Sequence, residues 1–178
     1  MARLKTLDEA SLSSETLESL NAVRINGQLA PVYLQYANSE SALRAYLHME
    51  KALQQGSLDD RTLEAIKLSV SQRTGCDFCL SVHTMKAKKA GFDETTQRAI
   101  RRGEPTGDAY IDAVQEIVQT FFTKRGVLPV ELMERAKAVG LDDGNLLDIC
   151  LAIATIVFTN ISNHINDTDL SLPPAPSI

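Results

Sequence analysis

Hydrophobic side chains recur along most of the chain at the spacing of an amphipathic helix. Over residues 39–55 and again over residues 108–124 they fall three or four positions apart, which gathers them on one face of a helix. Ser, Asp or Pro residues precede such segments and Gly residues follow them, as is typical of helix starts and stops. The pattern predicts helices that begin near residues 14, 31, 39, 57, 76, 93, 108, 129 and 142. No segment alternates polar and apolar residues as a half-buried strand does, so we predict an all-α fold.

The helix predicted over residues 142–165 contains the most apolar stretch of the chain. Its middle, ICLAIATIVF at residues 149–158, is hydrophobic all round, and we expect it to be buried on every side, in the core or in a subunit interface. Cys150 lies in this stretch and is expected to be an inert core residue. Residues 166–178 are rich in proline and are expected to form an extended tail.

The start of this helix resembles an earlier segment. Leu58-Asp59-Asp60 returns as Leu141-Asp142-Asp143, and further Leu and Ile positions coincide at the same offset. Helices that are capped by Asp and lined with Leu also resemble each other by chance. If the repeat is genuine, two helix pairs should superpose about a local two-fold axis. The positions of Cys76, Cys79 and His83 would then be matched by Thr159, Ser162 and Asn166.

Composition and charge exclude a disordered chain and argue against nucleic-acid-binding and membrane-binding proteins. The 178 residues are 44% hydrophobic and 23% charged, which excludes a disordered chain and fits a single domain over residues 1–178. The net charge of −5 argues against nucleic acid and against anionic membranes as partners. The apolar run at residues 149–158 is shorter than a membrane span, and the N-terminal segment lacks the apolar core of a signal peptide. We therefore expect a cytoplasmic protein.

The candidate chemistry lies in a Cys-x-x-Cys pair, Cys76 and Cys79. Cys76 follows Gly75 at the start of a predicted helix, where unpaired backbone amides and the helix dipole favour a thiolate. His83 lies one turn after Cys79 on the same face of this helix, where it can accept the thiol proton. The dipole thus favours Cys76 and the base favours Cys79. A positioned base acts on the reacting group itself, so we predict Cys79 as the nucleophile.

Glu64 can reach His83 if two of the predicted helices pack side by side. If the chain folds back around Gly75, Glu64 lies in the helix before the turn and His83 lies at a similar depth in the helix after it. At about 1.5 Å per residue the two depths differ by about 4.5 Å, which is within side-chain reach. A carboxylate there can orient the imidazole and stabilise its charge, which completes a set of nucleophile, base and orienting residue.

The spacing Glu-x(11)-Cys-x-x-Cys-x(3)-His, followed by a helix that ends at Gly91-Phe92, resembles the core of the alkyl hydroperoxidase AhpD. That core belongs to the carboxymuconolactone decarboxylase-like superfamily. The lead-in GSLDDRTLEAIKLSVSQRTGC is also similar, and the resemblance covers residues 31–102. It implies an AhpD-like helical bundle that assembles as a homotrimer or homohexamer, and reduction of hydroperoxides through a redox-active disulfide.

The resemblance also implies roles for individual residues. Cys79 would attack the peroxide, Cys76 would be the resolving thiol, and His83 and Glu64 would form a proton relay. Some members carry a second histidine between the cysteines, where this chain has Phe78, which cannot relay a proton and would slow the reaction. A dithiol reductant, either a lipoyl domain or a thioredoxin-like protein, would restore the thiols. No cofactor and no metal is implied.

Other interpretations of these residues stay open. Zinc could bind Cys76, Cys79, His83 and Glu64, although no second pair of ligands accompanies them. The cysteine pair could instead serve thiol–disulfide exchange or redox sensing without peroxidase activity. The decarboxylase branch of the superfamily lacks the pair, so the CDFC sequence argues against a lactone substrate. Two cysteines buried for packing alone would explain neither the pairing nor His83.

Three further polar residues are weaker candidates. His48 is expected at the surface or in an interface. Asn160 and His164, one helical turn apart near the end of the last helix, could line the pocket, cap the helix or lie in an interface.

Overall fold

The computed structural model describes residues 2–170 and 172–178, and this part of the chain is helical and contains no β-strand. The elements follow one another in the order η1 (Glu9–Ser11), α1 (Ser14–Asn21), α2 (Pro31–Tyr36), η2 (Ala37–Ser39), α3 (Glu40–Gln55), α4 (Asp60–Thr74), α5 (Asp77–Lys89), α6 (Glu94–Arg102), α7 (Ala109–Lys124), α8 (Val130–Ala138) and α9 (Asp143–Asn166). The predicted all-α class is confirmed.

The helices begin at the capping residues that the sequence offers. The side chains of Asp59, Asp93 and Asp142 each accept a hydrogen bond from a backbone amide in the first turn of α4, α6 and α9. The predicted start of α4 at Ser57 is slightly early, because Asp59 forms the cap. Ser57 instead donates its backbone amide and its hydroxyl to Asp148 of α9, which ties the loop between α3 and α4 to that helix.

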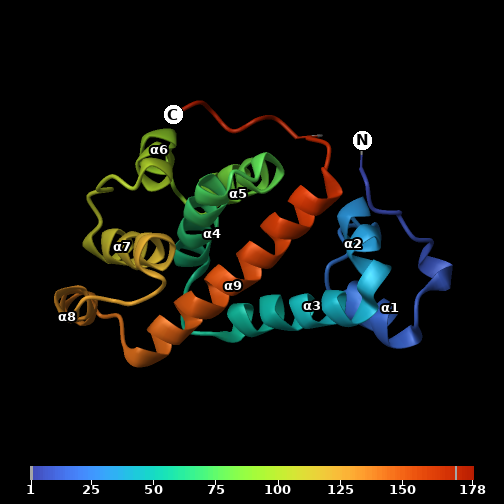
Figure 1. Ribbon diagram of the computed structural model, residues 1–178, viewed down its shortest axis with the longest axis horizontal. Helices are drawn as coiled ribbons and strands as arrows, with labels where there is room; N and C mark the ends of the chain where they lie inside the picture. Colours follow the sequence, from blue (N-terminus) through green and yellow to red (C-terminus); the bar gives the residue numbers. More distant parts are fainter. Residues whose placement is uncertain (1, 171) are drawn as a thin grey trace.

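Helix α4 lies at the centre of the molecule, with α9 running diagonally beside it (Figure 1). Its side chains belong to two hydrophobic cores. Ile66 and Val70 pack with residues of α7, α8 and α9, whereas Ala65 and Leu68 pack with residues of α5 and α6. Residues 62–71 are all buried, so α4 is covered on every side.

The N-terminal helices form a third core against the other side of α9. Tyr36 of α2 and Tyr46 of α3 meet Phe158 of α9, with ring centroids 5.5–6.1 Å apart. Figure 1 shows α1, α2 and α3 on the side of α9 that faces away from α6 and α7. Helix α9 therefore joins the two halves of the protein.

Helix α9 packs against both halves of the protein but leaves one face exposed. Ile149 and Ile153 lie in the core, but Leu147 and Ile161 are exposed. The prediction that residues 149–158 are buried on every side is wrong for the single chain, and so is the core position predicted for Cys150, which is exposed. The helical period turns these positions outward. Among the described residues, α9 is the helix long and apolar enough to cross a membrane by length and composition, which is weak evidence because core helices meet the same criterion.

Between the two interpretations of the repeat, the described residues favour a chance resemblance. Helices α4 and α9 do begin alike, each behind a capping Asp. Gly75 then ends α4 in the left-handed conformation, with φ of 71°, and the chain turns into α5. At the matching position Phe158 continues the helix, so α9 runs unbroken to Asn166 and has no partner helix to superpose.

The tail after α9 is extended, as predicted, within the described residues. Ala175 packs against the core formed by α4, α5 and α6, and Arg101 of α6 donates a hydrogen bond to the carbonyl of Pro176. The tail therefore runs back across the molecule toward α6, as Figure 1 shows.

Candidate active site

The turn between α4 and α5 positions both cysteines. Gly75 adopts a backbone conformation that residues with a side chain rarely take, and this lets α5 fold back against α4. Cys76 is the N-cap of α5, and its sulfur accepts a hydrogen bond from the backbone amide of Cys79 at 3.3 Å. Cys76 and Cys79 are both free thiols, and they are only 2% and 3% exposed.

His83 and Glu64 lie in direct contact beside this turn. His83 Nδ1 is 2.7 Å from Glu64 Oε2, and both side chains are buried. The contact that the fold-back at Gly75 predicts is therefore present. His83 also lies one turn after Cys79 along α5, as its sequence position requires.

The pKa values of His83 and Glu64 are both shifted by their surroundings. Burial lowers the pKa of His83 below its usual value, although Glu64 acts in the opposite direction. Burial raises the pKa of Glu64, but the hydrogen bond from His83 and the charges of His83, Lys86 and Lys67 outweigh it, so that pKa is lowered overall. Near neutral pH, His83 is thus neutral and Glu64 is ionised. His83 donates Nδ1–H to the carboxylate, which leaves the lone pair of Nε2 free to accept a proton.

A cavity of about 300 Å³ opens beside Glu64. It lies between α3, α4 and the end of α5, and its lining includes Lys67, Lys86 and Lys89. Lys67 is 5% exposed and is paired with both carboxylate oxygens of Glu50, at 2.9 and 3.0 Å. The carboxylate of the His83–Glu64 pair therefore lies next to solvent space that is lined by charged groups.

The two thiols are electrostatically unequal. A hydrogen bond from Cys79 lowers the pKa of Cys76, against the effect of burial. The same hydrogen bond, together with burial, raises the pKa of Cys79. A thiolate is therefore favoured on Cys76 over Cys79, and the helix N-terminus acts in the same direction.

Helix α9 contributes polar groups to the cysteines, of which the sequence analysis named Thr159 only as a repeat position and did not name Asn163. Asn163 Nδ2 donates a hydrogen bond to Cys79 Sγ at 3.2 Å, and Thr159 also lowers the pKa of Cys79 through a hydrogen bond. Tyr36 of α2 is close enough that the charges of both cysteines raise the pKa of its hydroxyl, after the larger effect of burial. One available signal was the pair of polar residues one helical turn apart, Thr159 and Asn163, directly after the apolar middle of this helix.

The structure places the three weaker candidates, Asn160, His164 and His48, in different surroundings. Asn160 is fully buried and donates to Thr74 Oγ1 at 2.7 Å, so it joins α9 to the end of α4. His164 and His48 are exposed, and Phe78 is half-buried. Over residues 2–170 and 172–178, no three His, Cys, Asp or Glu side chains converge as a set that could hold a metal ion. The zinc interpretation therefore finds no ligand set in that part of the chain.

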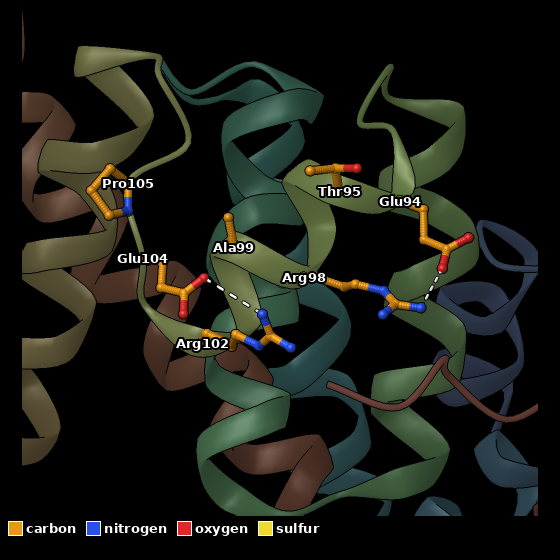
Figure 2. A pocket seen from close by; sticks show the side chains of 7 residues that line it. All are labelled: Glu94, Thr95, Arg98, Ala99, Arg102, Glu104 and Pro105. Atoms are coloured by element: carbon orange, nitrogen blue, oxygen red, sulfur yellow. Dashed lines mark hydrogen bonds and ion pairs between the residues drawn. The ribbon is translucent and has the colours of Figure 1, made fainter.

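A larger cavity of about 480 Å³ lies elsewhere, on α6 and the loop that follows it (Figure 2). Its charged residues pair with one another, Arg98 with Glu94 at 2.6 Å and Arg102 with Glu104 at 3.8 Å. None of the cysteine, His83 or Glu64 side chains lines it. Volume alone would select this surface hollow, but the candidate catalytic side chains lie between α4, α5 and α9.

The chain resembles known proteins in sequence and in fold. The model of the carboxymuconolactone decarboxylase family matches residues 40–115. The uncharacterized protein YdfG of Bacillus subtilis (strain 168) is 41% identical over 63 residues, which are 35% of this chain and 42% of that protein. The match thus spans less than half the length of that relative.

Two crystal structures show the same arrangement of helices. An uncharacterized peroxidase-related protein from Ralstonia eutropha JMP134, described as an alkylhydroperoxidase AhpD core, has a TM-score of 0.79 at 15% identity, over 97% of this chain and 92% of that one. The debrominase Bmp8 has a TM-score of 0.76 at 16% identity, over 95% of this chain and 92% of that one. Such identities establish the fold alone.

Residues 40–115 carry the family's sequence, and the helices outside that range complete the AhpD-like fold. The sequence similarity to the carboxymuconolactone decarboxylase family is thus confined to this segment, and the likeness to the AhpD core over the whole chain is one of fold.

Proposed function

We propose that this protein is a cysteine-dependent peroxidase that reduces hydroperoxides through Cys76 and Cys79. The observation that carries the proposal is the buried contact between His83 Nδ1 and Glu64 Oε2, one helical turn from Cys79. A neutral histidine with a free Nε2 is a competent base, and a buried carboxylate fixes its tautomer. A pair of cysteines packed only for stability would need neither group.

In the reaction, Cys79 gives its proton to His83 Nε2, and the thiolate forms a bond to one peroxide oxygen as the O–O bond breaks. The leaving alkoxide takes the proton from His83 and departs as an alcohol, so that Cys79 becomes a sulfenic acid. Cys76 then attacks this sulfur, an S–S bond forms, and water leaves with the Cys76 proton. A dithiol, either a lipoyl domain or a thioredoxin-like protein, reduces the disulfide by exchange and is itself oxidised.

The different pKa values of the two thiols are compatible with Cys79 as the attacking thiol and Cys76 as the resolving thiol. The raised pKa of Cys79 disfavours its thiolate, so its attack requires a base, and His83 on the same face of α5 is the base in this proposal. Cys76, whose pKa is lowered, is ready to resolve the sulfenic acid once it forms. Phe78, between them, supplies no proton, so the relay runs through His83 and Glu64.

Mass spectrometry after one equivalent of hydroperoxide, followed by turnover with dihydrolipoamide or thioredoxin, tests the proposal. We expect a Cys76–Cys79 disulfide and continued peroxide consumption. Cys150→Ser is the matched control, because this exposed thiol lies outside the site and its loss should leave the rate unchanged. A reversible disulfide without peroxide turnover by any dithiol would overturn the proposal in favour of thiol–disulfide exchange or redox sensing.

A further inference from the structure

A chain of hydrogen bonds runs from the end of α9 to the sulfur of Cys79. Asn166 Nδ2 donates to Thr168 Oγ1 at 2.8 Å, and the Thr168 hydroxyl donates to Asn163 Oδ1 at 2.8 Å. Asn163 Nδ2 donates to Cys79 Sγ at 3.2 Å. Each link donates in the same direction, toward the sulfur, and none of the three donors ionises near neutral pH.

The side-chain amide of Asn163 is held in one orientation. Asn163 is 5% exposed, and its oxygen accepts the hydroxyl proton of Thr168, so its NH₂ group must face Cys79. The same amide also forms a hydrogen bond that acts on Tyr36. With its oxygen and its nitrogen both engaged, the amide cannot turn over without breaking these contacts.

We propose that Asn163 is the fixed hydrogen-bond donor that stabilises negative charge on the sulfur of Cys79, and that Thr168 holds it in place. The mechanistic use of that charge rests on the proposed peroxidase reaction, but the interaction itself does not. A neutral amide stabilises an anionic sulfur without giving up a proton, so it can serve the attacking thiolate and the sulfenate that follows.

Cys79 needs such a donor because its surroundings otherwise oppose charge. The start of α5 directs the backbone amide of Cys79 to the sulfur of Cys76 instead. The titratable groups that interact with the Cys79 sulfur are Cys76, Tyr36 of α2 and Tyr46 of α3, and His83 follows one turn later on α5. Burial and Cys76 both disfavour the thiolate of Cys79, and the side chains of Asn163 and Thr159 act in the opposite direction.

The test uses a protein that carries Cys76→Ser and Cys150→Ser, so that Cys79 is the only cysteine thiol. The pH dependence of its alkylation by iodoacetamide and of its thiolate absorbance in the ultraviolet gives the pKa of Cys79. Asn163→Leu should raise that pKa by about one to two pH units, the usual worth of a hydrogen bond to a charged group. Asn160→Leu is the matched control, since Asn160 is buried on the same helix but bonds Thr74.

Thr168→Val keeps the test decisive if Asn163→Leu does not fold. Thr168 lies just beyond α9, and its loss should free the amide to turn, with a smaller rise of the Cys79 pKa. An unchanged pKa in both variants, or an equal rise in Asn160→Leu, would overturn the inference. None of these measurements uses peroxide. If the wild-type protein fails to consume peroxide while Asn163→Leu still raises the pKa, the proposed function falls and this inference stands.

Discussion

Helices α4 and α9 lie side by side, and their burial is the reverse of what their sequences suggest. The more polar helix, α4, is buried, whereas the more apolar helix, α9, has an exposed face. Helix α4 contains Glu64, Lys67 and two serines, yet all of its residues from 62 to 71 are buried. Helix α9 is far more apolar, yet it exposes Leu147, Ile161 and Ile165. Burial in this protein therefore follows the partners that a side chain finds, and not its polarity alone.

The charged residues of α4 are buried because each has a partner. Glu64 meets His83, and Lys67 meets Glu50. Removing either partner would leave an uncompensated charge in the interior, at a cost of about 3–5 kcal/mol. A buried Glu–His pair with shifted pKa values on the helices that meet at the two cysteines marks this region as a candidate functional site.

The apolar face of α9 is exposed within the described part of the chain. Leu147, Cys150, Ala154 and Ile161 share it at a spacing of three, four and seven positions, and no charged side chain interrupts it. Extended apolar surface of this kind is typical of protein–protein interfaces. We propose that it is buried between copies of the chain, in the homotrimer or homohexamer that the family resemblance implies.

The largest effect is expected at the cysteines that α4 and α9 enclose. Cys79→Ser should abolish rapid peroxide consumption, whereas Cys76→Ser should consume one equivalent and keep a dimedone-reactive sulfenic acid on Cys79. Mass spectrometry of the labelled peptides checks both. Dimedone on Cys76 in the Cys79→Ser protein would reverse the assignment and show that the helix N-terminus outweighs the base.

The buried charge of α4 provides the next test. Glu64→Gln keeps the shape of the side chain but weakens His83 as a base, so the rate should fall about 10- to 1,000-fold while the protein stays folded. Steady-state peroxide consumption and circular dichroism measure the two quantities. Glu94→Gln is the control, since Glu94 is exposed and pairs with Arg98 on α6. An unchanged rate in Glu64→Gln would reduce Glu64 to a structural role.

The exposed apolar face of α9 can be tested as an interface between copies of the chain. Light scattering of the wild-type protein should give a multiple of 19.5 kDa, and Leu147→Glu combined with Ile161→Glu should return a single chain. Ile25→Glu is the control, because Ile25 is also exposed but lies in the loop between α1 and α2. A wild-type mass equal to that of one chain would remove the proposal that this face is an interface.

The smallest effect concerns stability against pH. Because the pKa of His83 is lowered in the folded protein, the unfolded chain binds a proton below pH 6.5 that the folded chain does not. The free energy of unfolding should therefore fall as the pH drops below 6.5, by at most about 1.4 kcal/mol per pH unit. The lowered pKa of Glu64 adds a loss of the same sign below pH 4.5. Chemical denaturation from neutral to mildly acidic pH measures the slope, and His83→Gln should flatten its upper part.

Local physics explains what could be predicted from the sequence. Helix starts at Ser13, Asp93 and Asp142, and the break at Gly75, depend on residues within one turn of the chain. The contact of Glu64 with His83 also follows from one local event, because the turn at Gly75 fixes how far each residue lies from it. These features specify an all-α protein with a buried base and carboxylate beside two cysteines.

Tertiary structure decided the rest, because it brings together residues that are distant in the sequence. Asn163 and Cys79 lie 84 positions apart, and no periodicity relates them. Which face of α9 is buried also depends on where α3 and α4 pack, since its sequence is apolar around much of its circumference. A hydrogen bond or a buried face requires two segments of the chain in contact. The local sequence of each segment specifies that segment's own surface and not which other segment packs against it.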